Sequence, residues 1–245
     1  MKFDLLMHDF PVWATLGIGF VLGLRHALDP DHVAAVSTFA SHERNPLRAV
    51  FVGAFWGMGH TAALLVFGVT IAILRLEVTP RMSATMDFAV GIMLIILGVG
   101  VLVRLLRQGP RFHTHTHEHD GIRHSHIHFH LHGEEHAHAH RWLRLGGKPF
   151  LVGIVHGLAG TAAIMLMIVS AIPSLFLAVG YLLIFGLGTI GGMMAMSLLM
   201  GLPAAYAARR AGMLERGVRL TAGLFSLGFG LFLAWDVGFI QSFLR

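Results

Sequence analysis

The segment Arg25-His26-Ala27-Leu28-Asp29-Pro30-Asp31-His32 is the most polar part of a long apolar stretch, Pro11–Phe39. Five of its eight side chains are ionisable. An Arg or Asp at the centre of a membrane helix costs on the order of 2.5–3.5 kcal/mol, so such groups need partners there. We therefore expect these side chains to pair with one another or with a bound ion.

The composition around this segment is that of a membrane protein. Of the 245 residues, 55% are hydrophobic and only 13% are charged, and the mean hydropathy is +0.70. Ordinary soluble domains carry about 25% charged residues. Apolar runs recur along the chain, and each can cross a hydrocarbon core about 30 Å thick. The predicted spans are Pro11–Phe39, Ala49–Leu74, Phe88–Leu106, Phe150–Ile172, Leu175–Leu202 and Leu220–Ile240.

These runs predict an all-α integral membrane protein, because the backbone must satisfy its own hydrogen bonds in lipid. The first span is expected to break at Asp29-Pro30 and to be retained, because no signal-peptide cleavage pattern follows Lys2. There is no cysteine, so neither a disulfide framework nor thiolate ligands are available. The basic residues flank apolar runs and form no single patch, which excludes nucleic acid as a partner.

The distribution of Lys and Arg orients the predicted helices. Thirteen of the eighteen lie after the first, third and fifth spans, including those near the connection between spans three and four. Positive charge favours the cytoplasmic side. We expect a multi-pass protein of the cell membrane, the bacterial inner membrane, with the long connection in the cytoplasm and both termini outside.

The two halves of the chain resemble each other. Gly23-Leu24-Arg25-His26 aligns with Gly153-Ile154-Val155-His156, and Gly57-Met58-Gly59-His60 aligns with Gly186-Leu187-Gly188-Thr189. Gly91 and Gly98 match Gly223 and Gly230 at the same separation. Three spans per half imply an inverted 3+3 repeat, as in secondary transporters, unless glycine-rich helices are similar here by chance. Residues 1–106 are then the first three-helix repeat, which contains the polar segment, residues 107–149 are the connection, and residues 150–245 are the second three-helix repeat.

The polar segment has the composition of a transition-metal site. On a regular helix with about 100° per residue, His26, Asp29 and His32 share a stripe and Asp31 points elsewhere. Pro30 cannot continue the helix but suits the first turn of a new one, with Asp29 as its N-cap. The resulting turn is expected to bring Asp31 to the histidines, because imidazole and carboxylate ligands suit Ni²⁺, Co²⁺ and Zn²⁺. The alternative is a structural ion-paired cluster that includes Arg25.

Two further histidines lie within predicted spans. His60 lies mid-span between small residues and is a candidate fourth ligand. His156 occupies the position related to His26, but Ala159, Gly160 and Thr161 stand where the other half has Asp29, Pro30 and Asp31. His156 is a candidate ligand, a transit site or a packing residue.

The connection 107–149 is rich in histidine, with twelve between 113 and 140, mostly at alternate positions. This is a compositional signal for metal binding and not a rigid site. Alternation suggests a strand, but both faces are polar, so we expect a solvated loop that binds metal weakly at several places. A linker without function is the alternative.

With these residues in place, the chain resembles the nickel/cobalt transporter family. The segment Arg25–His32 resembles that family's signature, a His, four residues and then Asp-His, and Phe55-Trp56-Gly57-Met58-Gly59-His60-Thr61 resembles its second element. The match looks closer to the shorter, urease-accessory-like branch. The resemblance implies a permease for Ni²⁺ or Co²⁺ that uses His26, Asp31, His32 and His60, with no tightly bound cofactor. It also implies possible cytoplasmic metallochaperones or urease or hydrogenase maturation proteins as partners.

The leading hypothesis is therefore a secondary transporter, in the direction of uptake, and not an enzyme. Efflux with a metal-sensing loop stays open, because related efflux proteins carry histidine-rich loops. A membrane metalloenzyme fits less well, since the chain has no His-Glu-x-x-His element. The third alternative is an accessory protein that buffers metal through its loop. No nucleotide-binding loop is present, so the chain itself does not use ATP.

Overall fold

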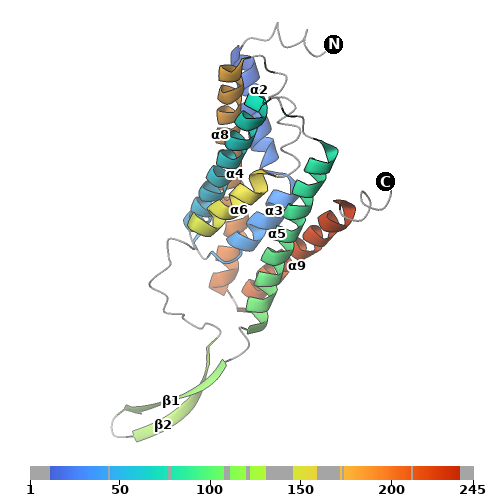
Figure 1. Ribbon diagram of the computed structural model, residues 1–245. Coiled ribbons are helices and arrows are strands. Elements are labelled where there is room, and N and C mark those ends of the chain that lie inside the picture. Colours follow the sequence, from blue (N-terminus) through green and yellow to red (C-terminus); the bar gives the residue numbers. More distant parts are fainter. Residues whose placement is uncertain are drawn as a thin grey trace.

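The computed structural model is a helical bundle with a two-stranded hairpin at one end (Figure 1). The described residues are 12–43, 45–74, 76, 79–107, 111–119, 122–130, 146–158, 172, 174–210 and 212–237. The predicted helical membrane fold is confirmed for the bundle.

The first span is broken where the sequence predicted. Helix α2 covers Val12–His26 and helix α3 covers Pro30–Ala40. Pro30 takes the first turn of α3, where its missing N–H costs nothing. Asp29 lies at the N-cap of α3, as the sequence predicted, and its side chain makes no cap hydrogen bond there.

Four long helices surround this broken element: α4 over Pro46–Leu74, α5 over Pro80–Arg107, α8 over Leu175–Arg210 and α9 over Gly212–Trp235. All four are long and apolar enough to cross a membrane by length and composition, while α2 is apolar but shorter. They start earlier than, or extend beyond, the predicted spans, because hydropathy marks the apolar centre of a helix better than its polar ends. The backbone N–H of Met82 donates to the Thr79 hydroxyl (3.2 Å) just before Pro80, which fixes the start of α5.

The fourth predicted span is described only in its first part. Helix α6 covers Lys148–Gly157. The expected continuation to Ile172 falls on positions outside the described residues, apart from Leu158 and Ile172 themselves. The count of six spans therefore stays a prediction.

The histidine-rich connection contains two strands that the prediction of a solvated loop omitted. Strand β1 covers Arg111–His119 and pairs antiparallel with β2, Ile122–His130. Alternation with period two is the strand pattern, and here it prevails over the polarity of both faces. In this register His113, His115 and His117 oppose His128, His126 and His124. The histidines at 132–140 lie outside the described residues.

Glycines let helix backbones touch in matched pairs. A Cβ on Gly23 of α2 would overlap the carbonyl oxygen of Phe185 in α8, and one on Gly153 of α6 would overlap that of Trp56 in α4. A Cβ on Gly98 would lie 2.7 Å from the Gly223 oxygen, where α5 packs on α9. Small residues at helix crossings permit such close approach in membranes. The centre of the bundle is therefore tightly packed and holds the ends of α2 and α6.

Apolar side chains also cover the outside of the bundle. Phe176, Trp13 and Val66 are among the large side chains that are at least 70% exposed. A soluble protein rarely exposes contiguous apolar surface on this scale. The outer surface is suited to hydrocarbon, and the polar groups gather inside.

Candidate metal site

Four buried imidazoles and two carboxylates meet at the break between α2 and α3. His26 is the last residue of α2, His32 lies in the first turn of α3, His60 in the middle of α4 and His156 in the last turn of α6. The side chains of His32, His60 and His156 are at most 1% exposed. The structure thus brings all six candidates from the sequence into one cluster, since Asp29 and Asp31 contact these rings.

His26 is held by Asp29. Its Nδ1 lies 2.8 Å from the Asp29 Oδ2, and its Nε2 lies 3.1 Å from the Nε2 of His60. When Nδ1–H donates to the carboxylate, Nε2 keeps its lone pair. A ring nitrogen that donates to a carboxylate is the usual arrangement behind a metal-binding imidazole. Asp29 therefore orients His26, which explains why its carboxylate does not cap α3.

Asp31 joins two histidines from different helices. Its Oδ1 lies 2.9 Å from the His32 Nδ1 and also accepts the backbone N–H of His32 (2.9 Å). Its Oδ2 lies 2.9 Å from the Nε2 of His156 on α6. The turn at Pro30 is what lets Asp31 face the histidines. Arg25 is exposed and makes no ion pair with Asp29 or Asp31, so the alternative of an Arg25-paired cluster is not what the structure has.

Three imidazole nitrogens in the cluster lack a hydrogen-bond partner among the described residues: His32 Nε2, His60 Nδ1 and His156 Nδ1. Buried polar atoms are nearly always paired, so such atoms call for a ligand. Two groups of residues each have potential ligand atoms that all lie within 4.8 Å of one another: His26, His32 and His60 form one group, and Asp31, His32 and His156 form the other. Neighbouring ligands at about 2.0–2.1 Å from an ion are roughly 3 Å apart, close to the 3.1 Å between His26 and His60.

Helix ends add charge of the right sign for a cation. The C-terminal ends of α2 and α6 both reach the cluster, and each carries about half a negative charge. Asp31 lies in the first turn of α3, where the positive end of that helix stabilises a carboxylate. The backbone thus favours a divalent cation bound beside an ionised Asp31.

Two aromatic residues that line the site were not predicted as functional residues from the sequence. Trp56 stacks on His32, with ring centroids 5.6 Å apart at 24°, and Phe185 lies 5.6 Å from His26. Both are fully buried. Each precedes a Gly-x-Gly element that the repeat alignment paired, and that shared position was the available signal. The rings exclude water from the imidazoles on both sides.

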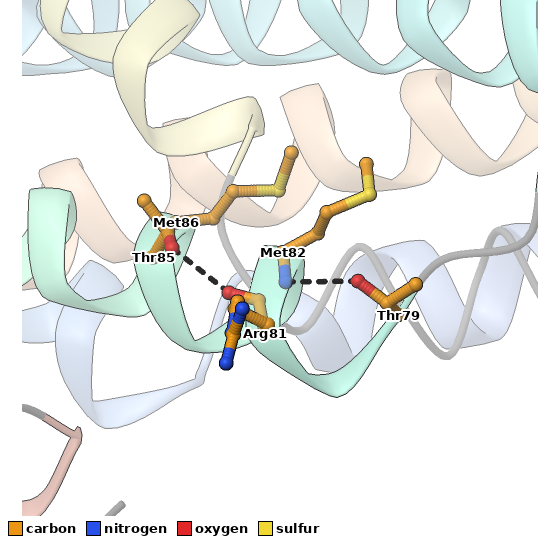
Figure 2. A pocket seen from close by; sticks show the side chains of 5 residues that line it. All are labelled: Thr79, Arg81, Met82, Thr85 and Met86. Carbon is orange, nitrogen blue, oxygen red and sulfur yellow. Dashed lines mark hydrogen bonds between the residues drawn. The ribbon is translucent and has the colours of Figure 1, made fainter. Parts of the chain in front are cut away.

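A separate open pocket of about 330 Å³ lies at the start of α5 (Figure 2). It is lined by Thr79, Arg81, Met82, Thr85 and Met86. The Thr85 hydroxyl donates to the Arg81 carbonyl (2.8 Å), so its polar groups serve the helix itself. Among the described residues that line the pocket, Arg81 is the one charged residue, so these residues offer no set of ligands for a cation.

A second histidine environment follows α3, outside the apolar spans. His42 Nδ1–H donates to the Thr38 carbonyl (2.7 Å). The pKa of His42 is lowered to about 4, mainly by burial; the Thr38 carbonyl opposes the shift, and the nearby guanidinium groups of Arg219 and Arg104 contribute to it. Arg219 also donates to the Ser41 carbonyl (3.4 Å), which ties the end of α3 to α9.

Comparison with known proteins agrees with this geometry. Residues 12–211 match the family model NicO, High-affinity nickel-transport protein. The chain is 33% identical over 239 residues to the Urease accessory protein UreH of Bacillus sp. (strain TB-90), covering 98% of each chain. It is 26% identical over 216 residues to the Chloroplast protein FOR GROWTH AND FERTILITY 2 of Arabidopsis thaliana, covering 87% of this chain and 54% of that protein.

A shorter match joins the chain to a protein named for transport. It is 31% identical over 78 residues to the High-affinity nickel transport protein of Cupriavidus necator, covering 31% of this chain and 22% of that one. No solved structure matches the chain.

Proposed function

The chain belongs to the NicO family of high-affinity nickel-transport proteins, and on this premise we propose that it is a secondary transporter that carries Ni²⁺ across the cell membrane. The observation that carries the proposal is the buried cluster in the helix break. Four imidazoles and Asp31 lie there, and three of the ring nitrogens have no hydrogen-bond partner in the part of the chain that the structure describes. Imidazole with carboxylate suits Ni²⁺, and the same donors accept Co²⁺ or Zn²⁺, so Co²⁺ is the second expected substrate.

The ligand set of the proposal is His26, Asp31, His32, His60 and His156, with Asp29 orienting His26. Asp29 holds the Nδ1 of His26, and Asp31 holds one nitrogen each of His32 and His156, which leaves the second nitrogen of these rings for the ion. The ion exchanges its water shell for these ligands, and the bound metal is cargo. No tightly bound cofactor enters the mechanism, and a family of transporters points away from an enzyme.

Transport requires that the cluster open to one face at a time. The regions 1–106 and 150–245 are proposed as inverted halves that rock around the cluster. The support for this proposal is the similar packing of the two halves, in which α2 lies against α8 as α6 lies against α4. In both pairs, a glycine of the shorter helix lies so close to the longer helix that a Cβ would overlap its backbone. A site between two such halves lies where alternating access is possible.

The proposed orientation follows the excess of Lys and Arg on one side of the bundle. It places 107–149 in the cytoplasm of a bacterium and the start of α2 outside. The histidine-rich connection then binds ions weakly on the cytoplasmic side, at the hairpin where histidines oppose histidines along β1 and β2. Similarity to a urease accessory protein supports delivery of nickel to cytoplasmic metallochaperones or urease maturation proteins as partners.

The test is flux of radioactive Ni²⁺ into proteoliposomes that hold the full chain. We expect uptake by the wild type. The triple variant His26→Ala/Asp31→Ala/His32→Ala should lose at least about tenfold in Ni²⁺ flux, because removal of residues that only support metal ligands already costs typically 10–100-fold in metal affinity or activity. Deletion of residues 113–140 should leave most of the flux, since the site lies in the bundle. Unchanged flux in the triple variant would refute the proposed site.

The histidine-rich connection also favours a second candidate, efflux with a metal-sensing loop. The two directions are separated by the sign of the change in cellular nickel and cobalt when the chain is expressed. A rise supports uptake and a fall supports efflux. Loss of all metal effects on deletion of 113–140 alone would instead support the metal-buffering accessory protein.

A further inference from the structure

The cluster is assembled from two half-helices that enter the bundle from opposite ends (Figure 1). Helix α2 ends at His26, and α6 ends one residue after His156. Each of these histidines has its own carboxylate, since Asp29 contacts His26 and Asp31 contacts His156. The site therefore has two sides, one at each half-helix end.

His32 lies between these two sides. Its ring centroid is 4.5 Å from that of His26 and 4.0 Å from that of His156, whereas the rings of His60 and His156 are 6.2 Å apart. The potential ligands accordingly fall into two groups and not one. His26, His32 and His60 form the first triad, and Asp31, His32 and His156 form the second triad.

The shared histidine limits how many ions can bind. The Nδ1 of His32 lies 2.9 Å from the Asp31 Oδ1, and its Nε2 has no hydrogen-bond partner among the described residues. A neutral imidazole carries a proton on one ring nitrogen and a lone pair on the other, so it binds one ion at a time. Two ions in the two triads would compete for His32.

We propose that the two triads are successive positions of a single transported divalent ion, which passes from one to the other while His32 stays bound. This rests on the proposed transport function. In the first triad the ion meets three neutral imidazoles beneath the end of α2. In the second it meets two imidazoles and a carboxylate at the end of α6. His156 is then a ligand of the second position only.

This arrangement gives a physical reason for a stepwise path. Releasing all ligands at once in a low-dielectric centre would leave a bare divalent cation, which is very costly. A common ligand keeps the ion coordinated while the others exchange. The halves need to move only far enough to favour one triad over the other.

The test compares equilibrium binding with flux in four single variants of the full chain. Ni²⁺ binding is measured on the purified protein in detergent, and Ni²⁺ flux in proteoliposomes. The variants His26→Gln, His156→Gln and His32→Gln keep the approximate volume of the side chain. His42→Gln is the matched control, because His42 is a histidine hydrogen-bonded in the same bundle but outside the cluster.

We expect the wild type to bind one ion per chain. The His26 and His156 variants should each keep that ion with an affinity within about tenfold of wild type, because each leaves one triad complete, yet lose flux by at least about tenfold. The His32 variant belongs to both triads and should lose affinity by about 100-fold. The control should keep both binding and flux.

A single site would behave differently. There, the His26, His156 and His32 variants would lose affinity equally, and flux would return at high Ni²⁺; this result overturns the two-position path but leaves the transport function standing. Two ions per wild-type chain, or normal flux in the His156 variant, would also overturn it. Absence of Ni²⁺ flux in the wild type would instead overturn the proposed function.

X-ray absorption at the nickel edge supplies a readout that does not depend on flux. The ion in His156→Gln should have three imidazole ligands, as in the first triad, and the ion in His26→Gln should have two. Equal imidazole counts in the two variants would contradict the two triads.

Discussion

In the first half of the bundle, α2 ends at His26 and the chain continues into Asp29, Pro30 and Asp31, whereas in the second half α6 ends beside His156 and the sequence lacks these residues. The packing around the two half-helices is nevertheless alike. Gly23 meets the backbone of α8 in the way that Gly153 meets the backbone of α4. The comparison teaches that the demands of packing and of metal chemistry are separable.

The reason lies in what each demand constrains. Backbone contact between helices leaves no room for a Cβ, so glycine is needed in both halves. The proposed ligands need only meet at the break between α2 and α3, and one carboxylate in the turn there can contact histidines on both sides. Asp31 does this, since its two oxygens face His32 of its own half and His156 of the other.

The first prediction concerns the packing that the halves share. Gly23→Ala and Gly153→Ala should each destabilise the chain by on the order of 1–3 kcal/mol, because the added Cβ overlaps a backbone carbonyl of the neighbouring helix. Thermal unfolding of the purified chain in detergent measures the effect. Gly17→Ala is the control, since its Cβ would have nothing within 4 Å, and a helical Gly→Ala change is favourable by up to about 1 kcal/mol.

The two glycine variants also test the comparison itself. Similar losses of stability would show that both halves pack in the same way. If Gly23→Ala lowered the stability of the chain and Gly153→Ala did not, the two halves would not pack in the same way. The proposal of inverted repeats would then lose its support.

Much of the fold followed from the sequence because hydropathy reports lipid-facing helices directly. The four long helices cover the cores of their predicted spans, and the break at Pro30 followed from the missing N–H of proline. The hairpin in 111–130 did not follow, because alternating histidines suit a solvated loop as well as a strand. Only the register between two strands could separate these alternatives.

The members of the buried cluster and the approach of Asp31 to the histidines were predictable, but the individual contacts were not. Ionisable residues in an apolar span are rare enough to mark the site from sequence alone. Asp29 lies at the N-cap as predicted, but the contact between its carboxylate and the His26 ring was not predicted. The link between Asp31 and His156 joins residues 125 positions apart, and no local pattern encodes such a contact.

The second prediction separates the two carboxylates. Asp31→Asn should lower Ni²⁺ flux by about tenfold or more, because it holds two rings and belongs to the second triad. Asp29→Asn should lower flux by no more than about threefold, because an amide oxygen can still accept from His26 and the side chain is 34% exposed. Initial rates in proteoliposomes at matched protein density measure both.

Equal losses in the two variants would mean that the halves do not depend on Asp31 as their link. Each variant serves as the control of the other for the loss of one negative charge near the helix break, since Asp29 and Asp31 are only two positions apart. Size-exclusion profiles of the purified variants exclude misfolding as the cause.

The smallest expected effect concerns acid, which should loosen the first half before the second. The buried His42 has its pKa lowered to about 4, whereas the unfolded value is near 6.5. As the pH falls from 6.5 towards 4, the opened form binds a proton that the folded form rejects, so stability is lost over this window. After correction for the intrinsic exchange rate, the protection of amides in α3 should fall there, with a loss on the order of 1–2 kcal/mol in opening free energy, before the protection of amides in α6 falls.

The charged groups around His42 affect how readily it is protonated, and a variant of His42 tests whether its protonation causes the loss of stability in acid. Arg219 and Arg104 disfavour the imidazolium, and Glu215, which pairs with Arg219 at 2.6 Å, opposes them only in part. His42→Gln removes the titrating group and keeps an amide that can donate to the Thr38 carbonyl, so in this variant the protection of amides in α3 should no longer fall between pH 6.5 and 4. An unchanged pH slope in that variant would assign the acid sensitivity to another group. Simultaneous loosening of α3 and α6 would mean that the two halves open as one unit, which the difference in their chemistry argues against.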